Sequence, residues 1–127
     1  MRVFKKHAGT LQLTRGEALI YKPIKNLKIK EARLETGEVL LTYPTKMRPW
    51  IADLIRKFGG AVNEVQPKKL QLDELGTAVW DLMDGRRSVL QIIKGFAKKY
   101  DLQTREAEVA VTQFLRMLGK RGIIGLK

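Results

Sequence analysis

The spacing of apolar positions changes at Asp73, from alternation to helical repeats. Before it, Leu70 and Leu72 alternate with a polar residue, which is typical of a strand. After it, apolar residues recur every three or four positions until Asp84-Gly85, a pair typical of a helix end. The pattern therefore predicts a strand that leads directly into a helix over Asp73–Met83.

Two more helices are predicted after this junction. One begins at Ser88, where Gln91 completes a capping box, and the other runs from about Thr104 to about Gly119. The apolar run Ile123–Leu126 fits either a last short strand or a cover over the core. The positions of the last helix expected to face inward are Ala107, Val111, Phe114, Leu115 and Leu118.

Residues before the junction predict a small antiparallel sheet. A strand begins within Leu27–Glu31, and Thr36-Gly37 marks a hairpin turn. The returning strand Glu38–Tyr43 alternates apolar and polar residues, and Pro44 is expected to end it. Gly59–Lys69 is polar and is predicted to be a flexible loop.

The first 26 residues are predicted to form a partly flexible extension. Residues 1–12 show no periodicity. Thr14 and Glu17 resemble a capping box, which predicts a short helix over Thr14–Tyr21 that Pro23 ends.

Arg48–Phe58 is predicted to be an amphipathic helix, because Pro49 suits a first turn and Gly59-Gly60 a stop. We expect its apolar stripe to pack on the same domain. The alternative is a helix that docks on a membrane surface or a partner. The stripe consists of Trp50, Ile51, Leu54, Ile55 and Phe58.

These elements predict an α+β fold that is winged-helix-like, with a small N-terminal antiparallel sheet followed by a three-helix bundle. Only about seven residues follow the last helix, too few for the wing that usually follows a recognition helix in DNA-binding proteins. We assign residues 1–26 to the extension and residues 27–127 to one domain, with the helix at about 48–58 as an insertion.

The chain of 127 residues carries a formal net charge of +12, which favours an anionic partner such as nucleic acid, an acidic peptide or an anionic membrane. Residues 1–70 hold 15 of the 25 basic and 6 of the 13 acidic residues, so the excess lies mainly in the first half. Plain solubility is the alternative explanation. The absence of cysteine, of a secretory signal and of a long apolar run predicts a cytoplasmic protein without a transmembrane segment.

Residues suited to catalysis are scarce, so we expect no enzyme activity, cofactor or metal site. The single histidine is His7, the single serine is Ser88, and there is no cysteine, which leaves little for nucleophilic catalysis or zinc binding. The glycines lack the spacing of a nucleotide-binding loop. Asp81 and Asp84 could act as paired carboxylates, but such a pair is more often a solvated helix end.

Two surfaces are candidates for binding a peptide. Lys68–Leu72 is expected to be an edge strand, which can accept a further strand from a partner. The last helix places four residues opposite its core stripe, and this face is either a binding surface or ordinary solvated surface. The candidate residues are Lys68, Lys69, Leu70, Gln71, Leu72, Arg105, Val109, Thr112 and Arg116.

The segment Leu70–Leu126 resembles the PqqD family. Each matching motif is common when taken alone, but the series of motifs in this order is specific to the family. The extension and the Arg48–Phe58 helix depart from the short form of the family, which indicates a longer variant. The matching positions are Leu72, Asp73, Gly76, Val79-Trp80, Asp84-Gly85, Ile92-Ile93, Tyr100-Asp101, Phe114-Leu115, Leu118 and Gly122-Ile123.

This resemblance implies a non-catalytic peptide chaperone. PqqD proteins bind the leader of a ribosomally made precursor peptide and present it to a radical SAM maturation enzyme in pyrroloquinoline quinone (PQQ) biosynthesis. Related domains serve other modified peptides. The family holds the leader as an added strand between the sheet edge and the last helix, which here implies the candidate residues above. It also implies a possible homodimer. The alternative function is a winged-helix DNA-binding transcription regulator.

Overall fold

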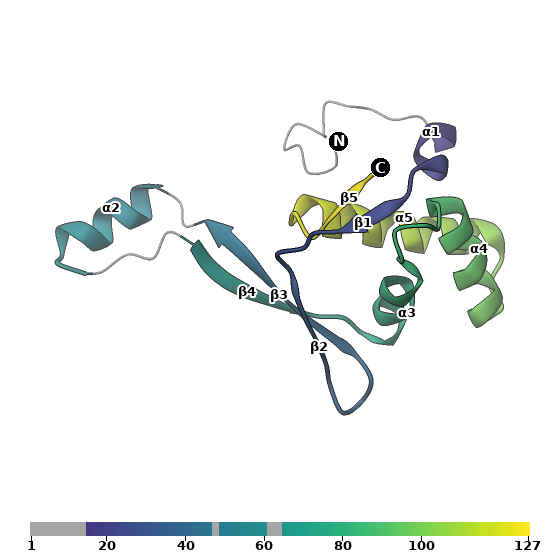
Figure 1. Cartoon of the computed structure of the whole chain (residues 1–127), viewed down its shortest axis with the longest axis horizontal. Helices are drawn as coiled ribbons and strands as arrows, with labels where there is room; N and C mark the ends of the chain where they lie inside the picture. The colour runs from purple at the N-terminus through teal and green to yellow at the C-terminus, as the bar shows by residue number, and fades with distance from the viewer. Residues whose placement is uncertain (1–14, 47–48, 61–64) are drawn as a thin grey trace.

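The computed structural model describes residues 15–46, 49–60 and 65–127, which form helices and two small antiparallel sheets (Figure 1). This arrangement confirms the predicted α+β class. The expectations for residues 1–12, His7, Thr14 and Arg48 lie outside the described residues. The helices are α1 (Arg15–Ile20), α2 (Pro49–Lys57), α3 (Glu74–Leu82), α4 (Val89–Tyr100) and α5 (Thr104–Lys120). The strands are β1 (Pro23–Lys25), β2 (Lys30–Arg33), β3 (Val39–Lys46), β4 (Val65–Gln71) and β5 (Ile124–Leu126).

The larger sheet has the order β2-β3-β4, so β4 is an edge strand, as predicted. The predicted hairpin turn at Thr36-Gly37 is confirmed, because Gly37 has φ +90° and the Leu34 N–H donates to the Glu38 carbonyl at 2.8 Å. β2 itself begins at Lys30, inside the predicted segment, and runs on to Arg33.

β3 and β4 are both longer than predicted. β3 continues through Pro44 to Lys46, and the predicted loop over Gly59–Lys69 is wrong from Val65 onward, where β4 begins. β2 pairs with β3 only as far as Thr42, so no β2 residue stands opposite Pro44. A proline without an N–H therefore breaks no hydrogen bond to β2 there.

The second sheet pairs β1 with β5 and joins the two ends of the described chain. The short helix predicted over Thr14–Tyr21 is confirmed as α1, which ends at Ile20, and Pro23 begins β1. β5 confirms the strand option for the last apolar run. Ile123 and Ile124 are also buried, so the same run covers the core.

The core lies between the inner face of β3 and the helices α3, α4 and α5. β3 contributes Val39, Leu41 and Tyr43 to it, all buried. The predicted strand-to-helix junction is confirmed, because the Asp73 side chain caps α3 by accepting from the Gly76 N–H at 2.7 Å. The capping box of Ser88 and Gln91 is confirmed at the start of α4.

α2 lies at the far end of the β3–β4 ribbon, apart from the other helices (Figure 1). The expectation that its apolar stripe packs on the same domain is wrong for Trp50, Leu54 and Phe58, which are exposed, whereas Ile51 and Ile55 are half-buried. The two strands extend beyond the end of β2 and carry α2 away from the core. No helix in the described ranges is long and apolar enough to cross a membrane.

Candidate functional site

The outer edge of β4 presents free backbone groups. The Leu72 N–H donates to the Val39 carbonyl at 2.8 Å, directly after the end of the β3–β4 ladder. Residues of an antiparallel strand bond alternately to one side and the other. Pro67, Lys69 and Gln71 therefore direct their backbone groups away from β3. Within the part of the chain that the structure describes, no strand pairs with this edge.

The side chains of β4 divide between the two faces of the sheet. Lys68 stands opposite Tyr43 and Leu70 opposite Leu41, and residues directly opposite share a face. Because Tyr43 and Leu41 are buried against the helices, Lys68 and Leu70 belong to the inner face. Lys69 and Gln71 lie on the outer face and are exposed, whereas Leu72, also predicted to bind the peptide, is buried in the core.

Three side chains show which side of α5 faces the sheet. A Cβ atom added to Gly76 would lie 3.1 Å from Cε1 of Phe114, so the absence of a side chain there lets α3 approach α5. Arg121, directly after α5, donates to the Tyr43 hydroxyl at 2.7 Å and to Met117 Sδ at 3.2 Å. The side of α5 with Phe114 and Met117 therefore flanks β3, the strand that pairs with β4.

The predicted residues of α5 are not all near β4. Arg105 lies 3.6 Å from the Glu108 carboxylate, which is buried and bound by Arg15 of α1. The Thr112 hydroxyl donates to the Glu108 carbonyl at 2.7 Å, within its own helix. At about 100° per residue, Arg105 and Thr112 lie on the side of α5 opposite Phe114. The structure therefore does not bring these two residues to the strand.

Val109 and Arg116 are exposed, and at about 100° per residue they also lie on the side of α5 away from Phe114. Arg116 lines an open hollow of about 420 Å³. The other residues of this hollow were not predicted, because helical periodicity points to the most solvent-facing side of the helix. Met117, three residues after Phe114 and so on the same side of the helix, was the available signal. The other lining residues are Gln113, Met117, Lys120 and Arg121.

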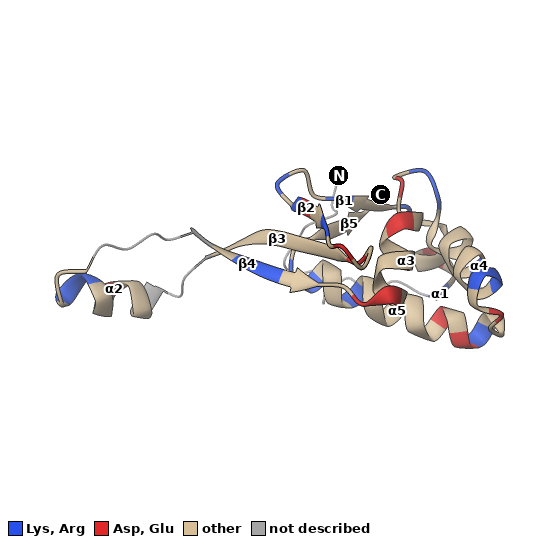
Figure 2. Cartoon of the chain, turned by 90° about the horizontal axis from the view of Figure 1, so that it is seen from below, with Lys and Arg blue, Asp and Glu red and all other residues tan. Residues whose placement is uncertain are grey.

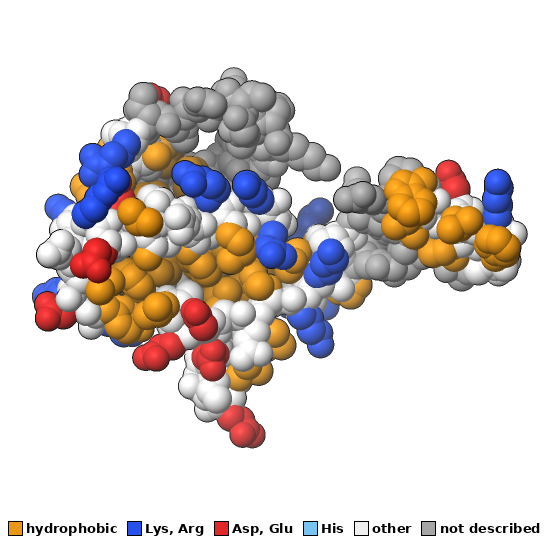
Figure 3. Space-filling model, turned by 180° about the vertical axis from the view of Figure 1, so that it is seen from behind, with side chains coloured by type: hydrophobic (Ala, Val, Ile, Leu, Met, Phe, Trp, Pro, Cys, Tyr) orange, Lys and Arg blue, Asp and Glu red, His pale blue; other side chains and the backbone are white. Residues whose placement is uncertain are grey.

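Charge and apolar surface are separated on the face that carries β4 and α5. Figure 2 places both elements on one side of the molecule, away from β1 and β5, with basic residues on β4 and at the end of α5. In Figure 3, hydrophobic side chains gather on the body between basic side chains toward α2 and acidic ones on the opposite side. This arrangement suits an extended ligand with apolar and acidic side chains.

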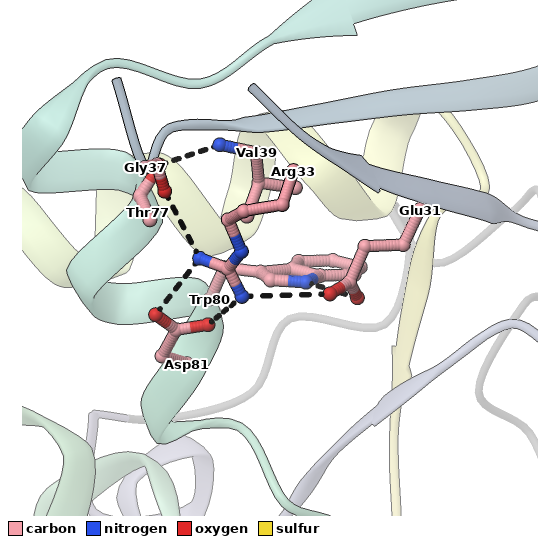
Figure 4. A network of polar contacts seen from close by, with 7 residues as sticks. All are labelled: Glu31, Arg33, Gly37, Val39, Thr77, Trp80 and Asp81. Carbon is pink, nitrogen blue, oxygen red and sulfur yellow. Dashed lines mark hydrogen bonds and ion pairs between the residues drawn. The ribbon is translucent and has the colours of Figure 1, made fainter. Parts of the chain in front are cut away.

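A polar network joins the sheet to α3 (Figure 4). The buried Trp80 donates its indole N–H to Glu31 of β2 at 2.7 Å, and Arg33 binds Asp81 at 2.9 and 3.2 Å. Lys25 lies 4.2 Å above the Trp80 ring, and burial lowers the pKa of its ammonium group. The network holds the β2–β3 hairpin on α3 and so helps to position β4.

The paired carboxylates considered above have separate structural partners. Asp81 binds Arg33, whereas Asp84 accepts hydrogen bonds from the backbone N–H groups of Arg87 and Arg86, which lower the pKa of Asp84. Among residues 15–46, 49–60 and 65–127, no group of three His, Cys, Asp or Glu side chains is placed to hold a metal ion.

Comparison with known protein families gives a match to one part of the chain. The family model described as coenzyme PQQ synthesis protein D (PqqD) matches residues 60–124, about half of the chain, including β4, α3, α4 and α5. No curated protein and no solved structure matches it. Membership of this family implies a peptide-binding accessory role in PQQ biosynthesis. On the match over β4 and the three helices that follow it, the chain belongs to the PqqD family.

Proposed function

We propose that the chain binds the leader of a ribosomally made precursor peptide as an added strand on β4. It presents the leader to a radical SAM maturation enzyme in the cytoplasm and itself contributes no catalytic group. Residues 27–127 are the peptide-binding domain in this proposal, with α2 as an insertion. The family match supports the peptide-binding role and gives no support to the DNA-binding alternative.

The observation that carries the proposal is the free edge of β4 beside α5. The N–H and C=O groups of Lys69 and Gln71 point outward, two residues apart, as an incoming strand requires. Pro67 has a carbonyl but no N–H, so the ladder loses a donor at that point. The fully paired part of the complex is therefore expected at Lys69–Gln71.

The flanking side chains indicate the chemistry of the bound peptide. Lys68 on β4 and Arg116 on α5 favour acidic side chains, and Leu70 and Met117 offer partly exposed apolar contacts. Strand addition supplies main-chain hydrogen bonds to any sequence, so these side chains are what selects among peptides.

The direct test is a titration of labelled short peptides encoded beside the gene, followed by fluorescence anisotropy. Random duplex DNA is titrated in parallel at low and physiological salt. Saturable binding of one peptide that persists at physiological salt supports the proposal. Binding of DNA with a steep salt dependence, and of no peptide, contradicts it.

Replacing Gln71 with proline tests strand addition at a single donor. Gln71→Pro removes an outward N–H without removing a β3–β4 hydrogen bond, so we expect affinity to fall about two- to tenfold. Gln71→Ala keeps the N–H and is the matched control, with affinity close to that of the original chain. Equal affinity for the proline and alanine variants, with both folded by circular dichroism, would exclude an added strand at this residue.

A further inference from the structure

α2 carries an apolar stripe that the rest of the described chain leaves uncovered. Trp50, Leu54 and Phe58 are 62%, 49% and 84% exposed, respectively. They recur at intervals of four residues and therefore lie along one side of the helix and its C-terminal end. Large apolar side chains grouped in this way, rather than scattered singly, are typical of an interaction surface.

The position of α2 makes this stripe accessible. The helix lies at the end of the β3–β4 ribbon, and both Figure 1 and Figure 2 show it apart from the other helices. Pro44 and Pro67 stand opposite each other in this ribbon. Both lack the N–H that edge-to-edge pairing needs, which disfavours pairing of a second copy along the ribbon beside α2.

The charged residues on and near α2 indicate which kind of surface its apolar stripe binds. Arg56 and Lys57 occupy the last turn of α2, where Arg56 pairs with Asp53 of the same helix at 3.3 Å, and Lys68 and Lys69 lie on the adjoining strand. Most of the acidic side chains in Figure 3, in contrast, lie on the body away from α2, and Glu38 and Glu74 line a hollow there with Asp81 of α3. This separation, together with the net charge of +12, favours approach of the α2 end to an anionic surface.

We propose that α2 is an interfacial helix that docks the protein on anionic lipid. Helices of this class combine Trp, Phe and Leu on one side with basic residues on the polar side, and they lie at the boundary between headgroups and acyl chains. Trp50 suits that boundary because its ring is apolar and its N–H is polar. The proposal does not depend on peptide binding at β4.

The test measures binding of the full chain to vesicles of phosphatidylcholine, alone or mixed with phosphatidylglycerol. Sedimentation gives the bound fraction, and tryptophan emission reports insertion. Trp80 is 1% exposed, so a blue shift on addition of vesicles comes from Trp50. We expect binding and a blue shift with the anionic vesicles only, weakened at physiological salt relative to low salt.

The double variant Trp50→Ser with Phe58→Ser should lower the partition coefficient roughly tenfold or more. Leu27→Ser is the matched control, because Leu27 is a fully exposed apolar residue of the body and should not affect binding. No binding of the original chain, equal binding to neutral vesicles, or equal loss in the control overturns the proposal. Peptide affinity measured on the same double variant should be unchanged, which separates this result from a failure of the proposed function.

Discussion

At the scale of single residues, the hydroxyl of Thr77 supplies a hydrogen-bond acceptor that a neighbouring strand would otherwise provide. The Val39 N–H points toward the β4 side of β3, but the chain has already turned into α3 at this point. The Thr77 hydroxyl accepts this N–H at 3.1 Å, and both residues are buried. A side chain of α3 thus completes the hydrogen bonding of the sheet where β4 ends.

Replacing Thr77 with valine keeps the shape of the side chain and removes this acceptor. The buried Val39 N–H is then left without a partner, so we expect the free energy of unfolding to fall by about 1–3 kcal/mol. Urea denaturation followed by circular dichroism measures the change. Thr77→Ser, which keeps the hydroxyl, should lose less stability than the valine variant. The reverse order would mean that the methyl group matters more than the hydrogen bond.

At the scale of elements, an ion pair between Arg15 and Glu108 links α1 to α5. Arg15 binds both carboxylate oxygens of Glu108 at 2.5 and 2.7 Å, across 93 positions of sequence. The hydrogen bonds from Arg15 hold the pKa of the Glu108 carboxyl below its ordinary value of 4.5. The carboxylate is therefore favoured in the folded chain.

This pKa shift predicts a stability that depends on pH. A carboxyl whose pKa is lower in the folded state contributes stability above its unfolded pKa, and this contribution is lost as pH falls through the folded value. Glu108→Gln should therefore be less stable than the original chain at pH 7, and the difference should shrink below about pH 4.5. Urea denaturation at pH 7 and pH 3 measures it. A difference that is the same at both pH values would show that the charge of Glu108 does not contribute.

The sequence predicted the elements whose signals are local. The capping residues Asp73 and Ser88 fixed the starts of α3 and α4, since their partners lie three residues away. The hairpin turn at Thr36-Gly37 depends on the backbone freedom of a single glycine. The inner positions of α5 followed from helical periodicity.

Elements that depend on distant partners could not be predicted in this way. β1 and β5 have three residues each and are defined by pairing across about a hundred positions. The start of β4 has the sequence Val65-Gln66-Pro67-Lys68, in which apolar and polar residues do not alternate clearly. For the candidate site, periodicity identified the outward side of α5. It could not show that the flank with Met117, rather than Arg105, faces the strand.

At the scale of the whole molecule, the net charge of +12 acts on any charged ligand before contact. Basic residues at the proposed binding surface come from two elements, with Lys68 on the edge strand β4 and Arg116 in the hollow on α5. Such a field raises the rate of association with an acidic peptide and is screened by salt.

Reversing these two charges tests steering toward the proposed binding surface. Lys68→Glu with Arg116→Glu should lower the association rate of an acidic leader roughly tenfold at low salt and reduce its salt dependence. Lys94→Glu with Lys98→Glu makes the same change in net charge on the exposed surface of α4 and is the control. Stopped-flow fluorescence measures the rates. Equal rates for the two variants would place the binding surface elsewhere or show that net charge alone matters.

The pairing of β1 with β5 also sets the order in which the chain can fold. The Lys22 and Lys127 backbones exchange two hydrogen bonds of 2.9 Å at the end of this sheet. During synthesis, β1 emerges from the ribosome early, yet it has no partner until Leu126 has been made. We expect contacts between such distant positions to form late in folding, because they close the longest loop. The β2–β3 hairpin and the helices can form earlier, so the second sheet closes the fold only after translation of the paired segment is complete.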